Sequence, residues 1–124
     1  MIFGVGVDII EVARVEDKLT RTPGLKEKLY TPVEIAYCES KKFPFQHYAA
    51  RFAAKEAFLK ALDTGWSRGV RFSEIEVRNL ESGQPVLEIY GRARELCQEE
   101  GITRFYVTLS HLQTKAVATV ILEK

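Results

Sequence analysis

The stretch Arg51-Phe-Ala-Ala-Lys-Glu-Ala-Phe-Leu-Lys60 belongs to a segment, residues 45–62, that carries apolar side chains at helical spacing without Gly or Pro. This pattern predicts the longest helix of the chain. Steps of four residues along it give two neighbouring rows, which are Tyr48, Phe52, Glu56 and Lys60, and Ala49, Ala53 and Ala57. Glu56 therefore lies within an apolar stripe, where a carboxylate is unexpected.

The opening run Met1-Ile-Phe-Gly-Val-Gly-Val-Asp8 contains a second carboxylate in apolar surroundings. Residues 2–8 alternate small and branched types, which predicts a central strand ending at Asp8, with Gly4 and Gly6 leaving room for close packing. A helix is expected to begin near Ile9. Asp8 is therefore either the N-cap of that helix or a functional carboxylate, and the two roles are compatible.

The remaining segments alternate between helix and strand signals. Val12, Val15 and Leu19 recur at helical spacing, and Thr31-Pro32-Val33-Glu34 is typical of a helix start that leads to about Ser40. Residues 75–77 and 86–89 alternate around a Ser82-Gly83-Gln84-Pro85 turn, and residues 91–100 predict a helix closed by Gly101. Residues 105–111 and 115–122 predict a hairpin. We expect a single α+β domain over residues 1–124, with a mainly antiparallel sheet packed on the long helix.

Bulk composition limits the function. A formal net charge of +1 excludes the strongly cationic balance of a general nucleic-acid binder. Cys38 and Cys97 lie in no metal or redox spacing, so we expect reduced, packed thiols. The N-terminus has no basic run, and no apolar stretch approaches the roughly 18 residues that a membrane span needs. These features predict a soluble, cytoplasmic protein.

Asp8 and Glu56, with Lys60 one helical turn after Glu56, suggest a hard-metal site that holds a phosphate-bearing substrate. The alternative is an exposed Glu–Lys pair worth about 0.2–0.5 kcal/mol. A basic stripe of Arg14, Lys18 and Arg21 is either a solvated face or a docking surface for an acidic protein.

The roles of His111 and of Thr64-Gly65 remain open at this point. His111 is a phosphate or ribose contact or a structural residue, whereas His47 shows no catalytic pattern. Thr64-Gly65 either presents backbone N–H groups to a phosphate or closes the long helix.

Four motifs in order closely resemble the holo-acyl-carrier-protein synthases, the compact single-copy type of 4′-phosphopantetheinyl transferase. They are Gly4-Val-Gly-Val-Asp8-Ile-Ile-Glu-Val-Ala-Arg14, Arg51-Phe-Ala-Ala-Lys-Glu-Ala-Phe-Leu-Lys-Ala-Leu62 with Thr64-Gly65, Gly83-Gln-Pro85 and Leu109-Ser-His111. The resemblance implies transfer of the 4′-phosphopantetheine arm of coenzyme A to a serine of apo-acyl carrier protein, with release of adenosine 3′,5′-bisphosphate. It also implies dependence on Mg²⁺ and a homotrimer with active sites between subunits.

The resemblance assigns roles to individual residues. Asp8 and Glu56 look like the Mg²⁺ ligands, and Lys60 resembles the lysine that contacts the reacting phosphate, so these three are the expected catalytic residues. Coenzyme A would be bound by Lys42, Arg51, Lys60, Thr64, Gly65, Pro85 and His111. The carrier protein would dock on Arg14, Lys18 and Arg21. The proton acceptor is left open between a metal-bound water and Glu56.

One residue departs from the family pattern, since Asp63 stands where relatives commonly have glycine. If this position needs a positive φ, Asp tolerates it better than most side chains. A competing interpretation of the whole chain is a non-catalytic module that docks acidic partners through its basic first helix.

Overall fold

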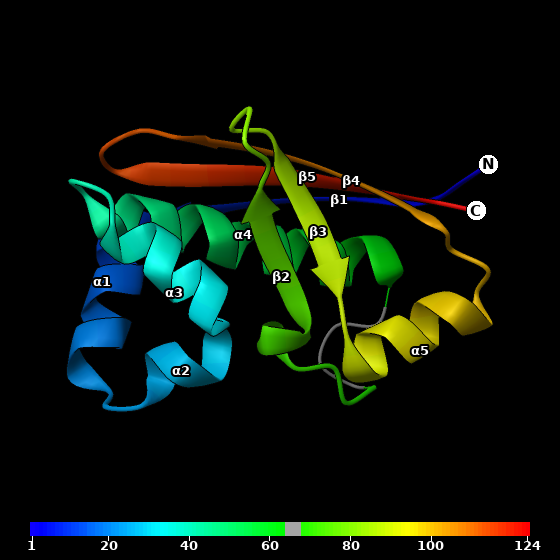
Figure 1. Cartoon of the computed structure of the whole chain (residues 1–124), viewed down its shortest axis with the longest axis horizontal. Helices are drawn as coiled ribbons and strands as arrows, with labels where there is room; N and C mark the ends of the chain where they lie inside the picture. Colours follow the sequence, from blue (N-terminus) through cyan, green and yellow to red (C-terminus); the bar gives the residue numbers. More distant parts are fainter. Residues whose placement is uncertain (64–67) are drawn as a thin grey trace.

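The long helix α4 (Pro44–Leu62) runs through the middle of the molecule, and the other elements pack around it (Figure 1). The computed structural model describes residues 1–63 and 68–124, so Thr64 and Gly65 lie outside the described residues. The helix predicted over residues 45–62 is confirmed. It begins with a proline at its first turn, where the missing N–H is no loss, and its C-cap Asp63 has a φ of 61°. Asp63 therefore adopts the left-handed conformation that glycine adopts most easily.

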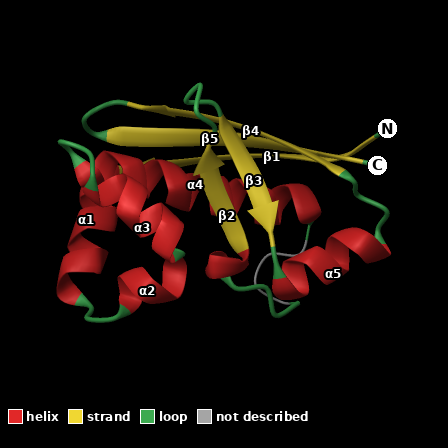
Figure 2. Cartoon of the chain, viewed as in Figure 1, coloured by secondary structure: helices red, strands yellow, loops and turns green. Residues whose placement is uncertain are grey.

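Before α4 come β1 (Ile2–Glu11), α1 (Val12–Arg21), α2 (Leu25–Leu29) and α3 (Pro32–Glu39). After it come a short 3₁₀ helix η1 (Phe72–Glu74), β2 (Ile75–Asn79), β3 (Pro85–Ile89), α5 (Gly91–Glu99), β4 (Arg104–His111) and β5 (Lys115–Glu123). Figure 2 shows the helices lying on one side of the longer sheet. In the part of the chain that the structure describes, no helix is long and apolar enough to cross a membrane.

Two antiparallel sheets flank α4 rather than the single sheet that we expected. The larger has the order β1-β5-β4 and includes the predicted hairpin of β4 and β5. The smaller consists of β2 and β3 alone and crosses in front of α4 in Figure 1. The two chain ends meet at one end of the larger sheet, where the Lys124 N–H donates to the Met1 carbonyl over 2.8 Å. The α+β class is confirmed.

The backbone of β1 lies directly against α4. A Cβ built on Gly4 would come within 1.9 Å of the Ala61 carbonyl oxygen, and one on Gly6 within 2.0 Å of the Ala57 carbonyl oxygen. No side chain fits at that distance, so glycine is required at both positions. The predicted alanine row supplies the other half of this contact, since Ala53 and Ala57 are fully buried. The contact fixes the position of Asp8 along the axis of α4.

The structure overturns one expectation about β1. The strand continues through Glu11, with Asp8 paired to Ala118 and Glu11 to Lys115 of β5, and α1 starts only at Val12 with Glu11 as its N-cap. The expectation that Asp8 ends the strand and caps a helix near Ile9 is wrong. Strand β5 is long enough to pair with residues 8–11 and to form hydrogen bonds with their backbone groups. Asp8 lies on the same strand face as Gly4 and Gly6, which is the face turned to α4.

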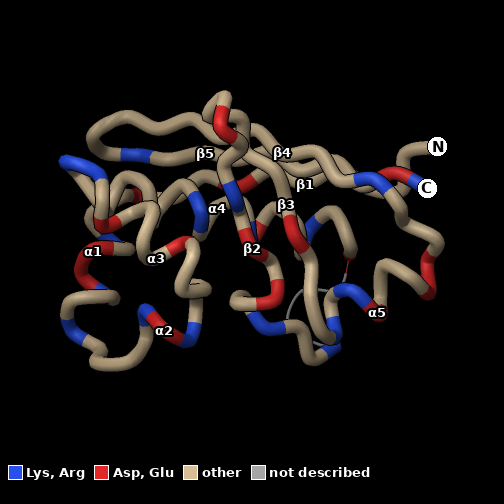
Figure 3. The backbone as a smooth tube through the Cα atoms, in the orientation of Figure 1, with Lys and Arg blue, Asp and Glu red and all other residues tan. Residues whose placement is uncertain are grey.

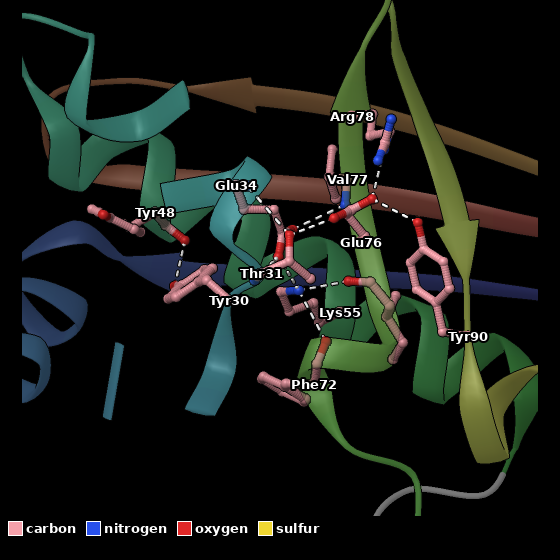
Figure 4. A network of polar contacts seen from close by, with 11 residues as sticks. Tyr30, Thr31, Glu34, Tyr48, Lys55, Phe72, Glu76, Val77, Arg78 and Tyr90 are labelled. Carbon is pink, nitrogen blue, oxygen red and sulfur yellow. Dashed lines mark hydrogen bonds and ion pairs between the residues drawn. The ribbon is translucent and has the colours of Figure 1, made fainter. Parts of the chain in front are cut away.

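A buried ion pair joins α4 to α3 and β2 (Figure 4). Lys55 Nζ donates to Glu34 Oε1 over 2.8 Å and to the carbonyls of Phe72 and Ile75, and both side chains of the pair are fully buried. Glu34 also forms a capping box with Thr31, at the predicted helix start, and accepts the Val77 N–H over 2.9 Å. Burial lowers the pKa of Lys55 and the Glu34 carboxylate partly offsets this. The pair thus anchors the smaller sheet to the helix that carries Glu56.

Both cysteines are free and buried, as expected. Burial raises the pKa of Cys38 to about 12 and that of Cys97 to about 11, so the thiols stay protonated and unreactive at neutral pH.

Candidate active site

Asp8, Glu56 and Lys60 meet at the contact between β1 and α4. Lys60 Nζ donates to Asp8 Oδ1 over 3.0 Å and to the Val7 carbonyl over 3.0 Å. The Asp8 side chain is 18% exposed and that of Lys60 is 55% exposed, so the ammonium group is accessible to a ligand. The strand–helix contact therefore places a cation and a carboxylate at the edge of the sheet.

Glu56 completes this group as a half-buried carboxyl. Burial raises its pKa, the neighbouring Asp8 carboxylate raises it further, and Lys60 and Lys18 oppose the shift. A cation or a proton offsets the repulsion between two neighbouring carboxylates, and Lys60 supplies part of that positive charge. Among the described residues, no group of three or more His, Cys, Asp or Glu side chains could hold a metal ion by itself. A metal at Asp8 and Glu56 would thus need further ligands from a substrate and water, which is how Mg²⁺ is usually held.

The basic stripe of α1 lies beside these carboxylates. Lys18 acts on the charge of Glu56, and Arg14 and Lys18 flank a small apolar depression formed with Ile10, Val15, Leu19, Leu29 and Phe52. Arg21 is partly neutralised by Asp17 at 2.8 Å. Figure 3 shows basic and acidic residues interspersed along the chain, so positive charge is local rather than general. Arg14 and Lys18 are the members of the stripe that border the site.

Arg51 lies in a second group on another face of α4. It is 2% exposed, its guanidinium carbon lies 4.1 Å from the centre of the Tyr37 ring, and it donates to Asn79 Oδ1. Asn79 in turn donates to the Gly83 carbonyl over 3.0 Å, which ties Arg51 to the turn before Pro85. Within residues 1–63 and 68–124, nothing accepts the buried Nε–H of Arg51. A buried guanidinium N–H without an acceptor is rare, and guanidinium groups pair well with phosphate.

His111 at the end of β4 belongs to the same region. Its Nδ1 lies 2.9 Å from Gln46 Oε1, and its ring lies 4.9 Å from that of His47. We did not expect a role for His47, although it precedes Arg51 by four residues and so shares its helix face. Lys42 is exposed in a groove of about 490 Å³, which is lined also by Gln46, Phe43 and the start of α1. Gln46 therefore connects the groove of Lys42 to His111.

The expected site residues thus form two groups rather than one. Asp8, Glu56 and Lys60 form the first group, and Arg51, the turn before Pro85 and His111 form the second. Arg51 and Glu56 are five positions apart, which is about 140° around a helix. The two groups consequently lie on different faces of α4.

The chain matches a family model described as the 4′-phosphopantetheinyl transferase superfamily over residues 4–120. A holo-[acyl-carrier-protein] synthase of a Geobacter species is 49% identical over the full length of both chains. Among solved structures, the holo-[acyl-carrier-protein] synthase of Neisseria meningitidis covers all of both chains at 30% identity and a TM-score of 0.89. The corresponding enzyme of Bacillus anthracis, in complex with CoA (3′,5′-ADP), is 35% identical with a TM-score of 0.81, over 98% of this chain and 96% of that one.

The family model spans both carboxylates, Lys60 and the second group, and the relatives match from end to end. The chain therefore belongs to the 4′-phosphopantetheinyl transferase superfamily.

Proposed function

We propose that this chain is an Mg²⁺-dependent holo-acyl-carrier-protein synthase that acts in the cytoplasm as a homotrimer. The chain is an enzyme that transfers the 4′-phosphopantetheine group of coenzyme A to a serine of apo-acyl carrier protein, as the names of its full-length relatives indicate. The observation that carries the metal and site assignments is the meeting of Asp8, Glu56 and Lys60. A docking module without catalysis has no use for these three groups together.

The donor set suits Mg²⁺. This ion prefers oxygen ligands in octahedral geometry and is commonly bound by one or two carboxylates plus substrate phosphates and water. Asp8 and Glu56 would hold it, and their mutual repulsion explains why the pair needs a cation. When bound, the ion would neutralise charge on the pyrophosphate of coenzyme A.

Lys60 acts on the reacting phosphate. In the transfer, the carrier-protein serine oxygen forms a bond to the β-phosphorus of coenzyme A, and its proton passes to Glu56 or to a water. The bond from that phosphorus to the adenosine 3′,5′-bisphosphate leaving group breaks. The exposed Lys60 ammonium, held by Asp8 and the Val7 carbonyl, would stabilise negative charge that develops as this bond breaks. The protein contributes mainly by positioning groups and by offsetting charge.

The nucleotide end of coenzyme A would occupy the second group. The orphaned Nε–H of Arg51 and the neighbouring His111 suit the 3′-phosphate, while backbone near Pro85 would meet the adenine. Lys42 would add positive charge at the rim of its groove, and Thr64 and Gly65 remain proposed ligands outside the described residues.

A homotrimer would unite the two groups. The outer face of the larger sheet carries the exposed apolar side chains Val5, Val7 and Ile9 of β1, which pair with Ile121, Thr119 and Val117 of β5. Tyr106 of β4, 47% exposed, extends the same face. A continuous apolar sheet face of this kind is typical of an interface. Further copies of this chain are the proposed occupant, because the first group of one copy would then approach the second group of another.

Light scattering tests the assembly. The wild-type chain should have three times the mass of one chain, and Val7→Glu should dissociate it and abolish transfer. Val33→Glu, at an exposed position of α3, is the matched control and should leave the trimer intact. A monomeric wild-type enzyme with full activity would contradict the trimer.

The intact mass of apo-acyl carrier protein, after incubation with this chain and coenzyme A, tests the reaction. A gain of about 340 Da, the mass of one phosphopantetheine arm, should occur with Mg²⁺ and not with chelator. Glu56→Gln should lose the gain, whereas Glu88→Gln, on the exposed side of β3, should retain it. Equal transfer by Glu56→Gln, or transfer without any divalent ion, would defeat the metal assignment.

A further inference from the structure

His47 lies in a cluster of basic side chains that come from separate elements. Its ring centre is 4.9 Å from that of His111 on β4 and 5.7 Å from that of Tyr37 on α3. Arg51 follows it by four residues on α4 and stacks on the same Tyr37 ring, 4.1 Å away. Lys41, just after α3, places its ammonium 4.6 Å from the Tyr37 ring centre. Tyr37 thus holds Lys41, His47 and Arg51 around one ring.

The neighbours that shift the pKa of His47 are basic side chains. Burial lowers its pKa first, and His111, Arg51 and Lys41 lower it further, to about 4. None of these neighbours is a carboxylate. His47 is therefore uncharged at neutral pH, and a nearby anion would stabilise its protonated form.

The same cluster contains a donor that lacks an acceptor. Arg51 is 2% exposed, and its Nε–H finds no partner within the described ranges. Its other contacts, to Asn79 and the Tyr37 ring, keep the guanidinium in place. A buried, fixed guanidinium with a free donor and an uncharged histidine on its own helix face is an arrangement that one phosphate group would complete.

We propose that His47 is a specificity-determining residue, which takes up a proton when the 3′-phosphate of coenzyme A binds beside Arg51 and His111. This inference rests on the proposed function. His47 would thereby help the enzyme to distinguish coenzyme A from 3′-dephospho-coenzyme A.

The sign of the pH effect follows from the two states of His47. A phosphate group carries about −1.5 to −2 charges near neutral pH, and an opposite charge within about 4–6 Å raises the pKa of a histidine by about 1–3 units. The pKa of His47 is consequently higher in the complex than in the free enzyme. The extra affinity is present at pH values below the pKa in the complex, and it is lost as the pH rises through that value.

Calorimetric titration measures the proton directly. Coenzyme A is titrated into the enzyme at about pH 6, close to the ordinary pKa of histidine, in two buffers with different ionisation enthalpies. The difference in heat between the buffers gives the number of protons taken up. Wild type should take up more protons than His47→Gln, a variant that keeps a polar side chain but cannot be charged. Because both proteins bind the same phosphate, the titration of the ligand itself cancels.

The matched ligand control is 3′-dephospho-coenzyme A. The ratio of its KM to that of coenzyme A should fall about tenfold in His47→Gln, the equivalent of one pKa unit. Rising pH should lower this ratio in wild type and change it less in the variant. A variant that loses activity equally on both ligands would show a merely structural role and overturn the inference.

The remaining outcomes separate the two proposals. Normal transfer by wild type, with equal proton uptake and equal ligand ratios in wild type and His47→Gln, would overturn the role of His47 alone. Failure of wild type to bind coenzyme A or to modify any carrier protein would overturn the proposed function and this inference with it.

Discussion

Lys60 Nζ lies 3.0 Å from Asp8 Oδ1, although the two residues are 52 positions apart in the sequence. Neither local helix formation nor a turn creates this contact. It exists because the backbone of β1 packs directly on α4, where Gly4 contacts Ala61 and Gly6 contacts Ala57. The candidate active site is therefore a direct consequence of the central packing contact of the fold.

Replacement of Lys60 by methionine should impair the chemical step more than binding. Methionine keeps the length of the side chain but removes the ammonium that would face the breaking phosphate bond. We expect kcat to fall about 10²–10³-fold, as for other single groups that stabilise transition-state charge, with a smaller change in the KM for coenzyme A. Initial-rate kinetics measure both. Lys28→Met, at an exposed position of α2, is the control; a loss confined to KM would contradict the assignment.

Gly6→Ala should separate β1 from α4. The new Cβ would lie 2.0 Å from the Ala57 carbonyl oxygen, so the strand or the helix must shift. Overpacking of this kind costs about 1–3 kcal/mol, and more where the obstacle is backbone. Asp8 would move with the strand, so the Mg²⁺ concentration needed for half-maximal activity should rise as well.

Denaturant unfolding and a Mg²⁺ titration check this prediction. Gly101→Ala is the control, because it makes the same chemical change in open space at a φ of 75°. It should cost about 1–2 kcal/mol from backbone strain alone, without any change in the Mg²⁺ requirement. Equal effects of the two substitutions would show that the Ala57 contact is unimportant.

The sequence predicted those parts of the fold that depend on local patterns. The long helix, the helix start at Thr31 and the β4–β5 hairpin are confirmed, because periodicity and cap chemistry act over a few residues. The separate β2–β3 sheet and the extension of β1 to Glu11 were missed, since they depend on where distant strands end. The five-residue helix α2 is too short to show a periodic pattern.

The candidate site, too, could be predicted from the sequence only in part. Asp8 and Glu56 were recognisable as carboxylates in apolar surroundings, and Lys60 by its spacing from Glu56. His111 was an open candidate, and the motif resemblance added Arg51. The sequence alone could not show that Arg51 is buried without a partner for its Nε–H, or that His47 lies against His111. Both facts depend on contacts among α3, α4 and β4.

The Lys55–Glu34 pair should be costly to break and less costly to replace. Lys55→Met leaves the Glu34 carboxylate buried without its cation, which is expected to destabilise the protein by about 3–5 kcal/mol. The double variant Lys55→Met with Glu34→Leu removes both charges, so its loss should be smaller than the sum of the single losses. Some loss should persist, because the N–H groups of Thr31 and Val77 lose their acceptor.

Denaturant unfolding of the two single variants and the double variant completes this cycle. Asp17→Asn, which breaks the exposed pair with Arg21, is the matched control and should cost less than about 1 kcal/mol. Additive losses in the cycle would show that Lys55 and Glu34 act independently.

Arg14→Glu should weaken the encounter with the carrier protein and leave coenzyme A binding unchanged. Arg14 is exposed on α1, beside the apolar depression and near Lys18, and it lies outside the group that would bind the nucleotide. Reversal of a rim charge mainly slows association with a partner of opposite charge, so we expect the KM for apo-acyl carrier protein to rise about tenfold or more. The salt dependence of that KM should also become weaker, because fewer attractive charges remain to be screened.

Arg94→Glu makes the same change on α5, at the opposite end of the molecule from α1 (Figure 1), and should alter neither KM. Equal increases in both KM values for Arg14→Glu would show that α1 affects the whole site rather than carrier docking.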